Sequence, residues 1–151
     1  MKLTSEQIVQ NWERLLNVIE TEFTGERKDK LLSMYKDLEE RMCMAPASSF
    51  SHYHNCMPGG YVDHVLRVIE CAQEVYDLWT RMGADMSGYT KEELIFVALN
   101  HDIGKMGFPG EGNEIYQPND SEWHRKNLGK EYKINPNNPF TLVNDLSIWL
   151  L

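Results

Sequence analysis

The sequence predicts an all-α protein built from about five or six helices. Apolar residues recur at spacings of three and four along several stretches, which is the period of an amphipathic helix. No stretch shows the alternation of apolar and polar residues that is typical of a strand. The chain has 151 residues, 42% of them apolar and 25% charged, and this composition predicts one globular domain over residues 1–151.

Two helices are expected before Pro46. Thr4 and Gln7 have the spacing of a capping box, so the first helix begins after Thr4, and Gly25 ends it. The apolar stripe of this helix consists of Ile8, Trp12, Leu15, Leu16, Ile19 and Phe23. The stripe of the second helix consists of Leu31, Leu32, Tyr35, Leu38 and Met42. We expect both stripes to face the core.

Two more helices are expected between residues 61 and 102. A loop rich in Ser, Pro and Gly covers residues 45–60, and a third helix follows over residues 61–81. The core stripe expected for it consists of Val62, Val65, Leu66, Ile69, Ala72, Val75, Tyr76 and Trp79. Thr90 and Glu93 form a second capping-box pattern. The helix that they open is apolar on all sides over residues 94–99, which predicts the central buried helix.

The last third of the chain is less regular. Residues 104–120 contain four glycines and two prolines and predict a long loop. A short helix is expected from Asp120 or Ser121, and a turn is expected over residues 135–139. Thr141 is the expected cap of a last helix. That helix runs to the chain end on three apolar residues, so we expect the natural polypeptide to continue further.

Composition also narrows the class of protein. The net charge of −8 argues against coating of nucleic acid through a positive field, although a local basic pocket stays open. No apolar run is long enough for a membrane span, and the N-terminus lacks the apolar core of a secretory signal. The three cysteines form no CxxC pair and are expected to be reduced. These features predict a cytoplasmic protein, in the host cytoplasm if the source is viral.

The strongest chemical pattern is His101-Asp102 followed by Gly104 and Lys105. A neutral imidazole and a carboxylate are ligands for Mn, Fe, Ni, Zn or Mg. Neighbouring residues on a helix point about 100° apart, so both reach one ion only where the helix ends. We expect Gly104 to end it with a positive φ. Lys105 adds a cation that can meet a phosphate oxygen.

His64 is the expected partner of this pair. It lies on the third predicted helix, 37 residues before His101. If the third and fourth helices pack antiparallel, the start of one lies beside the end of the other. His64 then faces His101 and Asp102, and the incoming loop brings His52 and His54 close to them.

Residues 58–68, Pro-Gly-Gly-Tyr-Val-Asp-His-Val-Leu-Arg-Val, and residues 98–105, Ala-Leu-Asn-His-Asp-Ile-Gly-Lys, resemble the HD superfamily of metal-dependent phosphohydrolases. The resemblance is specific over residues 50–107. Within this superfamily, the segment is similar to HD-type 3′–5′ exoribonucleases, and it is more similar to small HD proteins often carried by bacteriophages. It implies a helical HD bundle over residues 1–151.

The resemblance also implies the ligand set and the chemistry. Ligands of one or two divalent ions would be His64, His101 and Asp102. Asp145 would be the final ligand unless that ligand lies beyond residue 151, and His124 would serve a second metal. The implied activity is hydrolysis of a nucleotide or nucleic-acid phosphoester. The charge of −8 favours a small nucleotide over long duplex.

The implied roles are shared among few side chains. Asp102 and Lys105 would be catalytic, and the side chains that would contact substrate are His52, His54, Lys105 and Arg125. Ordinary surface roles are the alternative for the loop histidines, His124 and Asp145.

Two other functions stay open: a non-catalytic protein that binds metal and nucleotide, and a di-iron oxygenase, which needs more ligands. A homo-oligomer is also left open.

Overall fold

The computed structural model describes residues 2–138 and 143–151. Over these residues the fold is mostly helical. The α-helices are α1 (Ser5–Glu22), α2 (Gly25–Asp37), α3 (Glu39–Met44), α4 (Gly60–Arg81), α5 (Lys91–Asn100), α6 (Glu122–Leu128) and α7 (Val143–Leu150). A 3-10 turn, η1 (Ile103–Met106), follows α5. Two short strands, β1 (Tyr116–Pro118) and β2 (Tyr132–Ile134), form an antiparallel pair.

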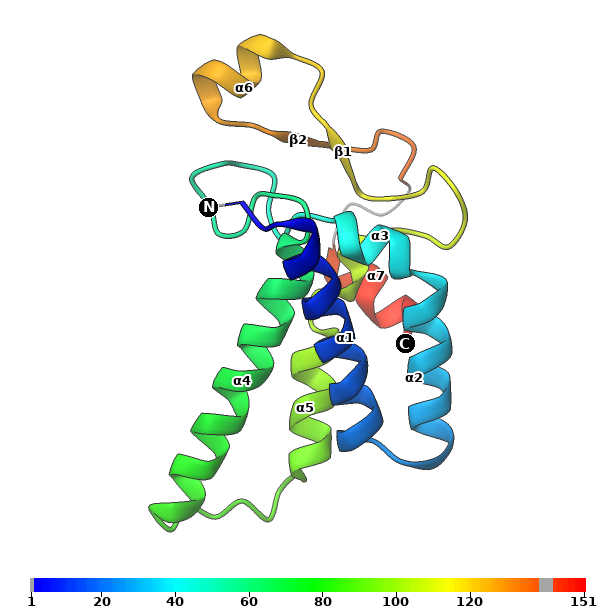
Figure 1. Cartoon of the computed structure of the whole chain (residues 1–151). Coiled ribbons are helices and arrows are strands. Elements are labelled where there is room, and N and C mark those ends of the chain that lie inside the picture. The colour runs from blue at the N-terminus through cyan, green and yellow to red at the C-terminus, as the bar shows by residue number, and fades with distance from the viewer. Residues whose placement is uncertain (1, 139–142) are drawn as a thin grey trace.

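Helices α1, α4 and α5 lie side by side and form the body of the molecule, with α2 beside α1 (Figure 1). Both predicted capping boxes are confirmed: the Thr4 hydroxyl accepts from the Gln7 N–H, and the Thr90 hydroxyl accepts from the Glu93 N–H. These caps set the starts of α1 and α5. No helix in the described part of the chain is long and apolar enough to cross a bilayer.

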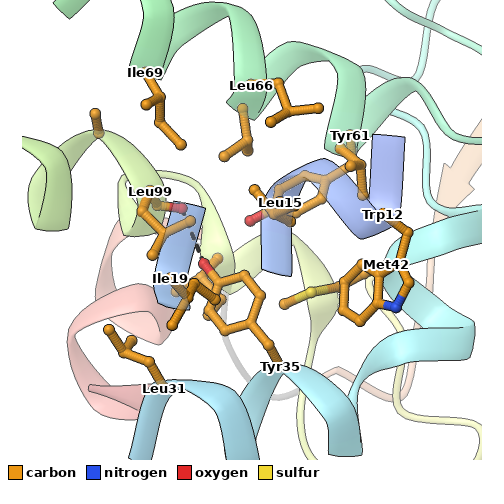
Figure 2. Close-up of a cluster of buried hydrophobic side chains, with 14 of the residues drawn as sticks. Trp12, Leu15, Ile19, Leu31, Tyr35, Met42, Tyr61, Leu66, Ile69 and Leu99 are labelled. Atoms are coloured by element: carbon orange, nitrogen blue, oxygen red, sulfur yellow. Dashed lines mark hydrogen bonds between the residues drawn. The ribbon is translucent and has the colours of Figure 1, made fainter. Parts of the chain in front are cut away.

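The core fills the space between these helices (Figure 2). Its largest fully buried side chains are Phe23, Tyr35, Tyr61, Leu15, Ile19, Met42, Ile69, Ile95, Leu99, Ile103, Met106 and Leu146. Polar contacts also cross this core: the Tyr35 hydroxyl lies 3.0 Å from the Leu99 carbonyl oxygen, to which it donates, and 3.1 Å from the Asn100 side-chain oxygen. The apolar stripes predicted for the first two helices therefore do supply much of the core.

Two expectations about secondary structure are wrong. The second predicted helix, expected to end before Pro46, is divided at Leu38, whose φ and ψ of −103° and 5° separate α2 from α3. The predicted absence of strands fails at β1 and β2. Each strand has only three residues, which is too short for apolar alternation to show in a sequence.

Burial also differs from expectation at two helices. Val75 and Trp79, predicted as core residues of α4, are instead exposed, at 41% and 52%. The fourth predicted helix is central but is not buried on all sides, because Val97 is 63% exposed. A stripe of apolar residues shows which face of a helix packs, but not how far along the helix a neighbour reaches.

The chain end packs beside the end of α5. Helix α7 lies against η1, and the Gly104 N–H donates to the Ser147 hydroxyl at 2.8 Å. The short helix expected from Asp120 or Ser121 is confirmed as α6, with Ser121 as its cap. The predicted Thr141 cap, and Pro139 of the predicted turn, lie outside the described residues.

Candidate metal centre

The loop before α4 is shaped by close backbone contact. Gly59 has a φ of 76°, in the left-handed region where glycine is favoured. Gly60 has no such φ, but a Cβ there would lie 2.1 Å from the Asn55 carbonyl oxygen. Asn55 also donates through its amide to the Gly60 carbonyl oxygen and to Asp63. The Pro-Gly-Gly segment therefore sets the loop against the first turn of α4, one turn before His64.

The end of α5 aims the other two side chains. Asn100 is buried, and its side-chain oxygen lies 3.1 Å from the Tyr35 hydroxyl. His101 still has helical backbone angles, whereas Asp102, at φ −118° and ψ 11°, has left the helix. The expected change of direction at this point is present. Gly104 does not produce it through a positive φ, because Gly104 is absent from the positions with positive φ.

Gly104 is instead a site of close approach. A Cβ on this residue would lie 2.1 Å from the Val143 carbonyl oxygen and 2.7 Å from the Ser147 backbone nitrogen. The glycine in the His-Asp-x-Gly-Lys motif therefore allows α7 to pack directly on η1. This contact supports the segment that carries Asp102 and Lys105.

His64, His101 and Asp102 converge, as the sequence predicts. The two Nε2 atoms are 3.2 Å apart, and the Asp102 Oδ2 atom lies 3.5 Å from His64 Nε2 and 3.3 Å from His101 Nε2. Ligand atoms bonded to one ion at about 2.0–2.2 Å lie roughly 2.8–3.6 Å apart at octahedral and tetrahedral angles. The three atoms match that spacing, so the cluster can hold a metal ion.

A backbone carbonyl beside His101 favours the protonation state that a metal ligand needs. The Nδ1 atom of His101 lies 2.8 Å from the Ala98 carbonyl oxygen. When Nδ1 carries the proton it donates to that carbonyl, and Nε2 is left with the lone pair that a cation needs. Side-chain exposures of 20% for His64 and 31% for His101 leave one side of the cluster open to solvent.

Lys105 contacts the same carboxylate. Its Nζ atom donates to Asp102 Oδ2 at 2.5 Å and to the Ala47 carbonyl oxygen at 2.8 Å, and its side chain is only 13% exposed. In this structure the ammonium group therefore neutralises the negative charge of Asp102. Lys105 is close enough to serve the phosphate predicted for it, but in this structure its Nζ atom is bound to Asp102.

The electrostatics of the cluster favour an ionised carboxylate. Burial alone would raise the pKa of Asp102, but hydrogen bonds from His101, His64 and Lys105 hold that pKa well below its usual range. The hydrogen bond to Asp102 raises the pKa of His101, against an opposing effect of burial. A divalent cation needs this anionic carboxylate, and it would displace the Nε2 protons with which the two imidazoles make these hydrogen bonds.

The loop histidines divide into one near residue and one remote residue. The His54 ring lies 4.7 Å from the His64 ring, between centroids. Burial, together with the nearby His64 and Lys105, lowers the pKa of His54. His52 instead packs against Phe50 and Tyr53 in an exposed aromatic group. Of the two, only His54 is beside the cluster.

Three other predicted residues lie outside the cluster. His124 is exposed on α6 and packs against Trp123. Asp145 is exposed on α7. The Arg125 guanidinium donates to the Asn119 carbonyl oxygen, which ties α6 to the chain after β1. Among the described residues, the three-ligand group contains none of these side chains.

Some groups at the site were not predicted from the sequence. The carbonyls of Ala47 and Ala98 carry no sequence signal, because every residue has one. Tyr61 is fully buried, its hydroxyl has no partner among the described residues, and burial and the charge of Asp102 raise its pKa. Tyr61 precedes His64 by three residues, a spacing that puts both on one face of α4.

A scan against family models, a search of curated proteins and a search of solved structures each give no match to this chain. The resemblance to the HD superfamily therefore rests on the motif residues alone.

Proposed function

We propose that this chain is a metal-dependent phosphohydrolase that acts on a nucleotide or nucleic-acid phosphoester. The observation that carries the proposal is the meeting of His64, from the start of α4, with His101 and Asp102, from the end of α5. Two helices contribute ligand atoms that lie 3.2–3.5 Å apart on a partly open surface. A catalytic metal site needs such an open side for water and substrate.

Each residue has a distinct part in this proposal. His64, His101 and Asp102 would hold one divalent cation. When bound, such a cation stabilises negative charge on phosphoryl oxygens and makes water more acidic. Lys105 lies against the same carboxylate and would bind a phosphate oxygen once a cation compensates Asp102. His54, next to His64, would contact the substrate from the loop side.

The experiment is a turnover assay on protein stripped of metal and reloaded with Mn²⁺. Nucleoside monophosphates and phosphodiester dinucleotides are the substrates. Turnover that requires Mn²⁺ and is lost in Asp102→Asn supports the proposal. Asp77→Asn is the matched control, because Asp77 is an exposed carboxylate near the far end of α4. Tight nucleotide binding without turnover would overturn the hydrolase proposal and favour the non-catalytic binding protein.

A di-iron oxygenase receives less support. Such a site needs ligands for two irons, and the described residues bring only one group of three together. His124 and Asp145, which would have to extend it, are exposed on α6 and α7.

A further inference from the structure

A groove runs between the β1–β2 pair and helices α2 and α3. Its volume is about 1270 Å³, larger than the roughly 300–1,000 Å³ of typical small-molecule sites. The groove is lined on one side by residues of α2 and α3, and on the other by the segment after η1 and by the two strands. In Figure 1 the strands lie beyond α3, on the side away from α5.

The strands present three ring side chains to this groove. Pro118 is paired with Tyr132 across the strands, and Tyr116 is paired with Ile134. Cross-strand partners, and residues two apart on one strand, share a face of the sheet. Tyr116, Pro118 and Tyr132 all line the groove. Both tyrosines are partly buried, and no hydrogen bond joins either hydroxyl to another described residue.

The groove reaches the metal cluster through one residue. Lys105 lines the groove, and its Nζ atom contacts Asp102. Burial, and after it the charge of Asp102, raises the pKa of Tyr116. Lys105 is therefore the residue that the groove and the cluster share.

Charge limits what the groove can hold. Its lining contains the carboxylates of Asp37, Glu40, Glu111 and Glu114, and the basic groups of Lys30, Arg41 and Lys105. Arg41 is already occupied, because its guanidinium donates to the carbonyl oxygens of Met106, Phe108 and Gly110. A chain of phosphates would meet an excess of negative charge along this surface. A neutral aromatic ring carries no charge that these carboxylates would repel.

We propose that this groove is the base-binding subsite of a nucleoside monophosphate, whose ring stacks on the face formed by Tyr116, Pro118 and Tyr132. The phosphate lies at the cluster end, beside Lys105. This inference rests on the proposed function for the position of the phosphate, but the stacking face exists without a metal. Stacking tolerates any base, because every base has a π-face.

The test measures binding of adenosine to metal-free protein by ligand-observed NMR. Adenosine carries the ring without the phosphate. Stacking on an aromatic side chain contributes enough that Tyr132→Leu should weaken adenosine binding by about fivefold to a hundredfold. Tyr89→Leu is the matched control, since Tyr89 is an exposed tyrosine that contacts Tyr76 far from the groove. If circular dichroism shows that Tyr132→Leu does not fold, Tyr116→Leu is used in its place.

A second arm separates this inference from the proposed function. Ribose 5-phosphate has a sugar and a phosphate but no base, and its binding is measured with Mn²⁺ present. Mn²⁺-dependent binding that is equal in wild type and Tyr132→Leu is expected. If adenosine binds all these proteins equally, the base subsite is refuted while the metal site stands. If adenosine binding depends on Tyr132 but ribose 5-phosphate never responds to Mn²⁺, the metal proposal fails alone.

Discussion

Replacing Gly60 by alanine should destabilise the fold and disturb the metal cluster together. The added Cβ would lie 2.1 Å from the Asn55 carbonyl oxygen, well inside contact distance. That oxygen accepts hydrogen bonds from the backbone N–H groups of Ala47 and Met57, at 3.0 and 2.9 Å. Overpacking costs about 1–3 kcal/mol, and each weakened hydrogen bond about 1 kcal/mol. With two such hydrogen bonds, we therefore expect a loss of about 3–5 kcal/mol of unfolding free energy.

Urea unfolding followed by circular dichroism measures this loss. Gly88→Ala is the control, because no atom lies within 4 Å of its added Cβ and its φ is not in the left-handed region. It should change stability by less than about 1 kcal/mol, in the stabilising direction. Movement of Ala47 would also disturb the hydrogen bond that its carbonyl oxygen accepts from Lys105, next to the metal cluster. Equal stability of the two variants would refute the close-contact explanation.

Three further predictions concern the residues around the cluster. Tyr35→Phe removes the hydroxyl that donates to the Leu99 carbonyl oxygen and should cost about 1–3 kcal/mol in urea unfolding; an unchanged midpoint would contradict this. Gly104→Ala forces α7 from η1 and should cost about 1–3 kcal/mol, with lost near-ultraviolet dichroism from Trp149; retention of both would show that α7 is not packed there. The depressed pKa of Asp102 stabilises the metal-free fold above the unfolded pKa of about 3.9, and this contribution disappears as pH falls. Wild type should therefore lose stability more steeply than Asp102→Asn between about pH 5 and 2, and parallel curves would refute the assignment.

Local patterns were enough to predict the elements that carry the site. The capping boxes at Thr4 and Thr90 depend on residues three apart, and both are present in the structure. The apolar stripe of α4 and the run in α5 predicted two packed helices. The meeting of His64 with His101 then followed from their antiparallel packing. Patterns within one helix turn decide these features, so the sequence shows them directly.

Contacts between distant segments could not be predicted in the same way. Gly104 looked like a helix terminator, but its role depends on the approach of Ser147 from α7. Strands β1 and β2, which contain Tyr116 and Tyr132, pair with each other although α6 separates them in the sequence. Each strand has three residues, too few to show an alternation of apolar and polar residues. Trp79 has the spacing of a core residue but is 52% exposed. Each of these outcomes depends on where another segment lies.

The central claim is that His64, His101 and Asp102 bind one divalent cation. The most direct measurement is elemental analysis of chelator-treated protein reloaded with Mn²⁺ or Zn²⁺ and passed through gel filtration. We expect about one ion per chain in wild type and in the control Asp77→Ala, and almost none in His101→Ala or Asp102→Ala. Full metal content in either of these two variants would contradict the claim.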